Sequence, residues 1–123
     1  SAEAECLQKS MKMALKDAGI KKVDSIVMHA PGTLKGDENE YKAIKKLFGT
    51  KLPHLISTKF ATGHSFGASG ALSMELAILM LKNQKTINFP YESIRFGIPN
   101  KLNKIMVNAT GFGGNAVSII LSR

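Results

Sequence analysis

Two histidines, His29 and His64, each follow an apolar run and stand beside glycines. An apolar run that ends in a polar residue and a glycine turn is typical of a strand ending at the carboxyl edge of a sheet, where α/β proteins bind their ligands. Two neutral imidazoles can both donate hydrogen bonds to one carbonyl oxygen and stabilise negative charge there, as decarboxylation and enolate chemistry require. The alternative for either histidine alone is structural, with the ring capping a strand or satisfying a turn.

Several neighbouring residues could assist this chemistry. Lys59 lies in the connection before the second histidine, where its charge could orient that imidazole, or it could simply be surface charge. Small residues at 67–70 predict a helix start that either binds an anion or packs closely on a sheet. The glycine-rich stretch 111–114 surrounds Phe112 and permits close backbone approach. We interpret His54 as a surface residue because it has no comparable setting.

Cysteine usage and hydropathy exclude several classes of protein. The single cysteine, Cys6, cannot form an internal disulfide and fits a cytoplasmic location. It lies on a predicted helix without an activating environment, so we expect a packing residue and not a nucleophile. No spacing typical of a metal site occurs, and no apolar run approaches the roughly 20 residues that span a bilayer. Because the chain lacks a starting Met, we expect a processed or excised segment.

The charge balance favours an anionic partner. The net charge is +8, from 17 Lys and Arg against 9 Asp and Glu, and an acidic carrier protein or a nucleic acid could bind such a chain. The alternative is a solvated, lysine-rich surface. Arginine occurs only at Arg95 and Arg123, whereas base readout depends on arginine forks and on clustered aromatic side chains. We therefore do not expect nucleic-acid binding.

The elements that position these residues follow from periodicity and turn signals. The predicted helices cover 3–18, 38–48 and 68–82, and the predicted strands cover 23–29, 54–58, 104–109 and 116–122. Gly19 and Gly49 end the first two helices, and Asp37 with Glu40 resembles a capping box. The third helix is apolar nearly all round, which predicts burial on several sides. Alternating helices and strands followed by a hairpin indicate an α/β domain spanning 1–123.

Three motifs occur in order along the chain. The first sets His29 before Gly32-Thr33, Asp37 and Glu40. The second is Lys59-x-x-Thr62-Gly63-His64-x-x-Gly67-Ala68-Ser69-Gly70, and the third joins Asn108 to Gly111-Phe112-Gly113-Gly114-Asn115-Ala116. Together they resemble the C-terminal part of the β-ketoacyl-acyl-carrier-protein synthases, the condensing enzymes of fatty-acid and polyketide synthesis. The resemblance extends over nearly the whole chain.

This resemblance implies a partial thiolase-like fold, a mixed sheet with packed helices, and decarboxylative Claisen condensation of a malonyl-carrier thioester with an enzyme-bound acyl group. It implies that His29 and His64 hydrogen-bond the thioester carbonyl and that Lys59 supports the second histidine. It also implies that Thr33 contacts the phosphopantetheine arm. Phe112 would gate the acyl pocket, with its backbone N–H in the oxyanion hole and Gly113 beside it in the substrate-binding loop.

The same resemblance implies particular partners. These are an acyl carrier protein bearing the malonyl and acyl thioesters, the N-terminal half of the same enzyme, and a second subunit in a homo- or heterodimer. It implies no metal and no cofactor beyond the carrier's phosphopantetheine. Lys42, Lys45 and Lys46 are candidate contacts for the acidic carrier protein.

Departures from the family pattern leave an alternative open. The nucleophilic cysteine belongs to the missing half, so we expect this chain to be inactive alone. Pro31 stands where the family often has Thr, and Ser73 where bacterial members often have Glu, which fits a non-catalytic partner resembling a chain-length factor. In the family a central strand precedes the first helix. We therefore expect a gap in the sheet, which the segment closes by rearrangement or by self-association.

Overall fold

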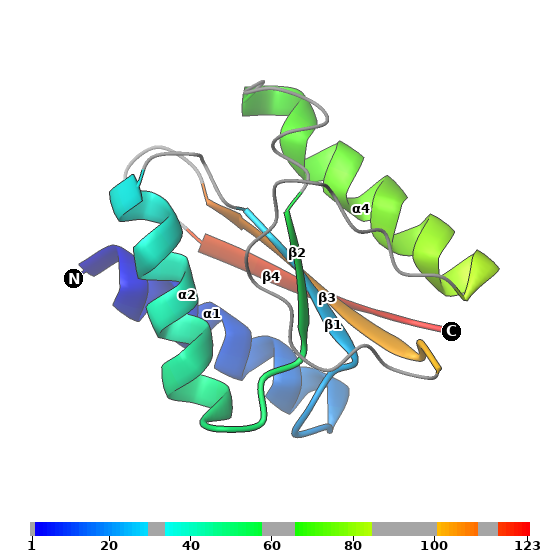
Figure 1. The fold of residues 1–123 in the computed structure, drawn as a ribbon, viewed down its shortest axis with the longest axis horizontal. Coiled ribbons are helices and arrows are strands. Elements are labelled where there is room, and N and C mark those ends of the chain that lie inside the picture. Colours follow the sequence, from blue (N-terminus) through cyan, green and yellow to red (C-terminus); the bar gives the residue numbers. More distant parts are fainter. Residues whose placement is uncertain (1, 30–33, 58–65, 85–100, 111–115) are drawn as a thin grey trace.

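The computed structural model describes residues 2–29, 34–57, 66–84, 101–110 and 116–123, which form a sheet between two helical layers (Figure 1). The elements, in chain order, are α1 (Ala2–Ala18), β1 (Ser25–Met28), α2 (Leu34–Phe48), β2 (His54–Ser57), α4 (Phe66–Asn83), β3 (Lys104–Thr110) and β4 (Ala116–Ser122). Helices α1 and α2 cover one face of the sheet, and α4 covers the other. None of the helices described here is both long and apolar enough to cross a bilayer.

The sheet has four strands in the order β2-β1-β3-β4. Strand β1 pairs in parallel with β2 on one side and with β3 on the other, while β3 and β4 form the predicted antiparallel hairpin. The described strands leave no open gap, because β1 and β3 are direct neighbours, with Ser25 opposite Ile105. Of the two expected outcomes, closure within the chain's own sheet is therefore the one that the structure shows. The mixed α/β architecture itself is confirmed.

Successive side chains of each strand point to opposite faces of the sheet, so the molecule has two separate hydrophobic cores, one on each face. Ile26 and Met106 face α1 and α2, whereas Val27 and Val107 face α4. The helices present matching apolar residues to these faces, including Leu7 and Met11 of α1, Ile44 of α2, and Ala77 and Met80 of α4.

The first helix ends as the sequence predicts. Gly19 adopts a φ of 69°, a left-handed conformation in which a side chain would be strained. Its N–H donates to the Lys16 carbonyl at 3.1 Å, and the Ile20 N–H donates to the Leu15 carbonyl at 3.1 Å. These are the two hydrogen bonds of a Schellman motif, which satisfy carbonyls that the helix itself leaves open.

Two burial predictions differ from the structure. Cys6 is exposed on α1 and is not a packing residue, because the buried stripe of this helix runs through Leu7, Met11 and Leu15. The part of helix α4 whose burial is described, residues 74–83, is not buried on every side, since Ile78 and Leu79 are each 50% exposed. The second face of this apolar helix therefore has no cover within the described part of the chain.

The side of β4 that faces α4 is also incompletely covered. Val117 is 54% exposed and Ile119 is 41% exposed, although both share a sheet face with the buried Val107. We call Ile78, Leu79, Val117 and Ile119 the exposed apolar set.

Asp24 connects the start of β1 to the start of β3. Its carboxylate Oδ2 accepts the N–H groups of Asn103 at 2.7 Å and of Lys104 at 2.9 Å. Its own N–H donates to the Lys104 carbonyl at 2.9 Å, and its carbonyl accepts from the His54 N–H at 3.3 Å. This one residue therefore aligns the amino ends of three neighbouring strands.

Candidate functional site

His29 directly follows the last residue of β1 and is partly buried. Strand β2 ends beside it, because Met28 pairs with Ser57, and β3 continues past the same level from Val107 to Thr110. The predicted position of His29 at the carboxyl edge of a parallel sheet is confirmed. Ligands of α/β proteins bind at this edge.

The other predicted site residues lie outside the described residues. Thr33 belongs to 30–33, Lys59 and His64 belong to 58–65, and Phe112 and Gly113 belong to 111–115. The ends of these three segments are nonetheless placed. The first joins His29 to the start of α2, the second joins Ser57 to the start of α4, and the third joins Thr110 to β4.

The described residues that precede these three segments lie at one edge of the sheet. Each segment leaves from the carboxyl end of a different strand, and the three strands are neighbours in the order β2-β1-β3. Helices α2 and α4 also begin near this edge (Figure 1). All three sequence motifs thus depart from one end of the sheet, on elements that are far apart along the chain.

Glu40 anchors the backbone at His29. It is only 1% exposed, and its Oε2 accepts the His29 N–H at 2.8 Å. The capping-box interpretation of Asp37 and Glu40 is wrong, because α2 begins at Leu34 and both residues lie inside the helix. Glu40 instead reaches across to the end of β1.

Asn108 joins this carboxylate to the last strand. It is 1% exposed, and its Nδ2 lies 3.4 Å from the Glu40 Oε2 and 3.4 Å from the Met11 Sδ. Its Oδ1 accepts the Ser118 hydroxyl at 2.7 Å, and the Ser118 Oγ accepts the Ser10 hydroxyl at 2.8 Å. The result is a hydrogen-bonded series from α1 to the end of β1.

Sequence reasoning missed the roles of Ser10, Asn108 and Ser118. Asn108 was identified only as part of the third motif. Its pairing with Ser118 follows from the predicted hairpin, since residues opposite each other across the glycine turn share one sheet face. The register of that hairpin is the signal that could have identified the pair.

His54 is buried and not on the surface as predicted, with 0% exposure. It stands opposite Ser25 in the sheet. The Ser25 hydroxyl donates to the backbone carbonyl of His54 at 3.0 Å. The same hydroxyl oxygen lies 3.4 Å from the imidazole Nδ1 of His54. This pair sits at the amino ends of β1 and β2, so His54 belongs to the opposite edge from His29.

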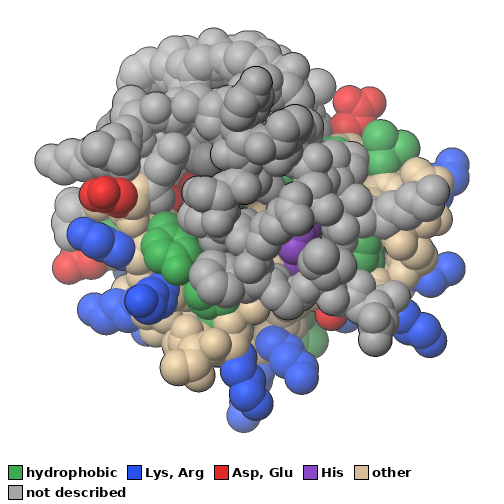
Figure 2. All heavy atoms as spheres, in the orientation of Figure 1, with side chains coloured by type: hydrophobic (Ala, Val, Ile, Leu, Met, Phe, Trp, Pro, Cys, Tyr) green, Lys and Arg blue, Asp and Glu red, His purple; other side chains and the backbone are tan. Residues whose placement is uncertain are grey.

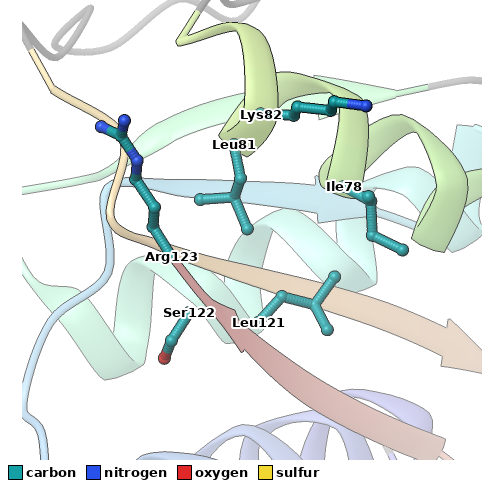
Figure 3. A pocket seen from close by; sticks show the side chains of 6 residues that line it. All are labelled: Ile78, Leu81, Lys82, Leu121, Ser122 and Arg123. Carbon is teal, nitrogen blue, oxygen red and sulfur yellow. The ribbon is translucent and has the colours of Figure 1, made fainter.

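An open pocket between α4 and the end of β4 also lies away from His29 (Figure 3). It has a volume of about 430 Å³ and is lined by Ile78, Leu81, Lys82, Leu121, Ser122 and Arg123. Leu121 pairs with Ile105, which is level with Ser25 at the start of β1. The pocket is therefore near the amino edge of the parallel strands and does not join the candidate site.

The outer face of α2 is basic. Lys42, Lys45 and Lys46 are all exposed, and their spacing puts them on one side of the helix. Lysine and arginine side chains line the lower and lateral edges of the molecule in Figure 2, with fewer acidic ones between them. The basic outer face of α2 can attract an anionic partner.

Comparison with known families and sequences gives consistent matches. Residues 1–89 match the family described as beta-ketoacyl synthase, C-terminal domain. The chain is 39% identical over 136 residues to 3-oxoacyl-[acyl-carrier-protein] synthase 2 of Coxiella burnetii, covering 98% of this chain and 33% of the relative. It is 36% identical over 113 residues to 3-oxoacyl-[acyl-carrier-protein] synthase 1 of Haemophilus influenzae, covering 82% of this chain and 28% of the relative. The chain thus spans about a third of these curated relatives.

Solved structures resemble the fold closely. The ishigamide ketosynthase/chain length factor superposes with a TM-score of 0.81 at 26% identity, over 97% of this chain and 33% of that one. A type II polyketide ketosynthase, solved with its acyl-carrier protein, superposes with a TM-score of 0.78 at 27% identity, over 100% of this chain and 34% of that one. The partial thiolase-like fold expected from the motifs is therefore confirmed.

Proposed function

This chain belongs to the β-ketoacyl synthase family, whose C-terminal domain it matches, and from that premise we propose that it forms the decarboxylating part of a 3-oxoacyl-[acyl-carrier-protein] synthase. The domain covers 1–123. The observation that carries the proposal is the common origin of three segments: 30–33, 58–65 and 111–115 all leave from the carboxyl ends of adjacent parallel strands. These segments, with His29 itself, hold every residue that the motifs assign to the reaction.

The proposed reaction step is decarboxylation of a malonyl thioester. The bond between the malonyl carboxylate carbon and the α-carbon breaks, carbon dioxide leaves, and the electron pair forms an enolate whose charge resides on the thioester oxygen. His29 and His64 donate hydrogen bonds to that oxygen, so they stabilise the transition state more than the neutral substrate. Lys59 orients His64, and Thr33, Phe112 and Gly113 contact the acyl and phosphopantetheine groups.

The enolate then attacks the carbonyl of an acyl group held as a thioester on a cysteine, and the cysteine thiolate leaves. That cysteine belongs to the N-terminal half of the enzyme. We propose that this half covers the exposed apolar set, because those four side chains lie open on α4 and β4. The chain alone then forms no 3-oxoacyl product.

Carbon dioxide release from malonyl carrier protein by the complete enzyme tests this proposal. His29→Ala and His64→Ala are each expected to reduce decarboxylation by about 10²–10³-fold, the range for removal of one donor from an oxyanion site. Ser122→Ala, an exposed change at the opposite edge of the sheet, is the control and retains full activity. Unchanged carbon dioxide release in both histidine variants would falsify the assignment and favour the non-catalytic partner.

The carrier protein is proposed to dock on the basic face of α2. Reversing Lys42, Lys45 and Lys46 to Glu is expected to weaken carrier binding by at least tenfold at low salt, with the effect shrinking as salt rises. The matched control reverses Lys9, Lys12 and Lys16 on α1, which are also exposed and change the net charge equally. Equal loss of binding in the two triple variants would reject α2 as the docking site.

A further inference from the structure

We propose that Ser118, assisted by Ser10, is a positioning residue for His29 and acts through Asn108 and Glu40. The inference rests on the proposed function of His29 for its effect on catalysis. Its structural basis is the series of side-chain contacts from Ser10 on α1 to Ser118 on β4, Asn108 on β3 and Glu40 on α2. The series ends at the His29 backbone N–H, 2.8 Å from the Glu40 Oε2.

The hydrogen bonds in this series have a fixed direction. Because Ser10 donates to the Ser118 Oγ at 2.8 Å, the Ser118 hydroxyl hydrogen is directed to its second partner, the Asn108 Oδ1 at 2.7 Å. The Asn108 oxygen then faces Ser118, and its NH₂ group faces Glu40. Ser118 therefore holds the oxygen end of the Asn108 amide, and Glu40 holds its NH₂ end.

The opposite orientation of the amide is unfavourable. It would put the Asn108 oxygen 3.4 Å from the Glu40 carboxylate, where Nδ2 lies now, and two acceptors would face each other. Asn108 and Glu40 are both 1% exposed, so water cannot readily relieve such a contact, and buried polar groups without matched partners are costly. Glu40 and Ser118 therefore favour the same orientation of the amide, and loss of the Ser118 hydroxyl removes the donor that fixes the position of the Asn108 oxygen.

The Glu40 carboxylate in turn holds the backbone of His29, the residue that we propose acts in decarboxylation. The strand pairing of β1 ends at Met28, so Glu40 extends the anchored backbone by one residue to His29. An Asn108 amide held only from the Glu40 side can shift, and a carboxylate that shifts with it loosens this anchor. The imidazole would then sample a wider range of positions at the edge of the sheet, and small displacements of a donor reduce stabilisation of the transition state.

Packing alone does not explain a serine at this position. Ser118 lies between Ala116 and Ile120 on the face of β4 that packs against α1, and both neighbours contact the apolar core. An apolar side chain would suit that face better. The hydroxyl is accounted for by its two hydrogen-bond partners.

Hydrogen exchange of the 123-residue chain tests the inference without any assay of catalysis. Ser118→Ala is expected to speed exchange of the His29 amide by about five- to tenfold, the effect of losing one neutral hydrogen bond. Ser118→Thr restores protection, because threonine keeps the hydroxyl and suits a strand. Ser122→Ala, a serine of the same strand that contacts Lys104, leaves exchange at His29 unchanged.

A double-mutant cycle separates this role from general packing. Ser10→Ala alone is expected to speed exchange at His29 by two- to threefold, but to have no effect in the Ser118→Ala background, since Ser10 acts only through Ser118. Additive effects of the two changes, or no effect of Ser118→Ala at His29, would overturn the inference. In the complete enzyme, Ser118→Ala lowers kcat for decarboxylation and leaves KM unchanged. If His29→Ala keeps full decarboxylation while the exchange results hold, the proposed function fails and the positioning series stands.

Discussion

Removal of the Glu40 carboxylate is expected to destabilise the whole domain. Glu40→Ala deprives the His29 N–H and the Asn108 NH₂ of an acceptor and leaves a cavity in a site that is only 1% exposed. Each orphaned buried donor costs about 1–3 kcal/mol, and loss of the buried side-chain volume adds about 1 kcal/mol. The expected loss is therefore about 3–7 kcal/mol.

Glu40→Gln removes the negative charge of this side chain but keeps its size and one acceptor oxygen. Because both donors approach the same oxygen, Oε2, the amide oxygen of glutamine can accept from both without movement of the backbone. Only the charge assistance is lost, so the expected cost is about 1–2 kcal/mol. The wild type is then the most stable of the three proteins, Glu40→Gln is intermediate and Glu40→Ala is the least stable.

Urea unfolding followed by far-ultraviolet circular dichroism measures these differences. Glu38→Ala is the matched control, since Glu38 lies on the same helix with an exposed side chain, and its expected change is within about 0.5 kcal/mol. A Glu40→Ala variant as stable as Glu38→Ala would refute the role given to the buried carboxylate. A Glu40→Gln variant as unstable as Glu40→Ala would show that the charge, and not the acceptor geometry, holds the strand end.

Three further predictions concern the fold. Gly19→Ala should lower the free energy of unfolding by about 1–2 kcal/mol, because no atom crowds the site and the cost comes from the φ of 69° alone; no loss in urea titration would contradict the Schellman end. Asp24→Ala should cost about 1–3 kcal/mol by orphaning the Asn103 and Lys104 amides, whereas Asp24→Asn keeps an acceptor and should cost less, which thermal melts can compare. The isolated chain should self-associate through the exposed apolar set. Light scattering should then show a smaller mass for Leu79→Lys and Ile119→Lys than for Lys82→Ala, and a monodisperse wild-type monomer would reject this expectation.

The elements themselves could be predicted because their signals are local. The apolar stripe of α1 and Gly19 determine where that helix runs and ends, and the glycines of 111–114 separate the two strands of the hairpin. The start of α2 could not be found in this way, since the periodic apolar residues begin only after Lys35 and Gly36. In the structure the helix begins four residues before the predicted start, at Leu34.

Burial of individual polar residues depends on partners that sequence spacing does not reveal. His54 is buried because pairing of β1 with β2 puts it opposite Ser25. Glu40 was recognised as part of a motif, but its contact with the His29 backbone depends on how α2 packs over the end of β1. The motifs already contained Glu40 and Asn108, whereas Ser10 on α1 and Ser118 on β4, which complete the hydrogen-bonded series, belong to none of them.

The position of β1 inside the sheet has a consequence for the order of folding. Its neighbours are β2, which follows soon in the chain, and β3, which Asp24 contacts at Lys104 across 80 residues. During synthesis on the ribosome, β1 and β2 emerge long before the strand that completes their other side. Contacts so distant in sequence form slowly, so the flank of β1 that pairs with β3 stays open to misassembly until β3 has been made.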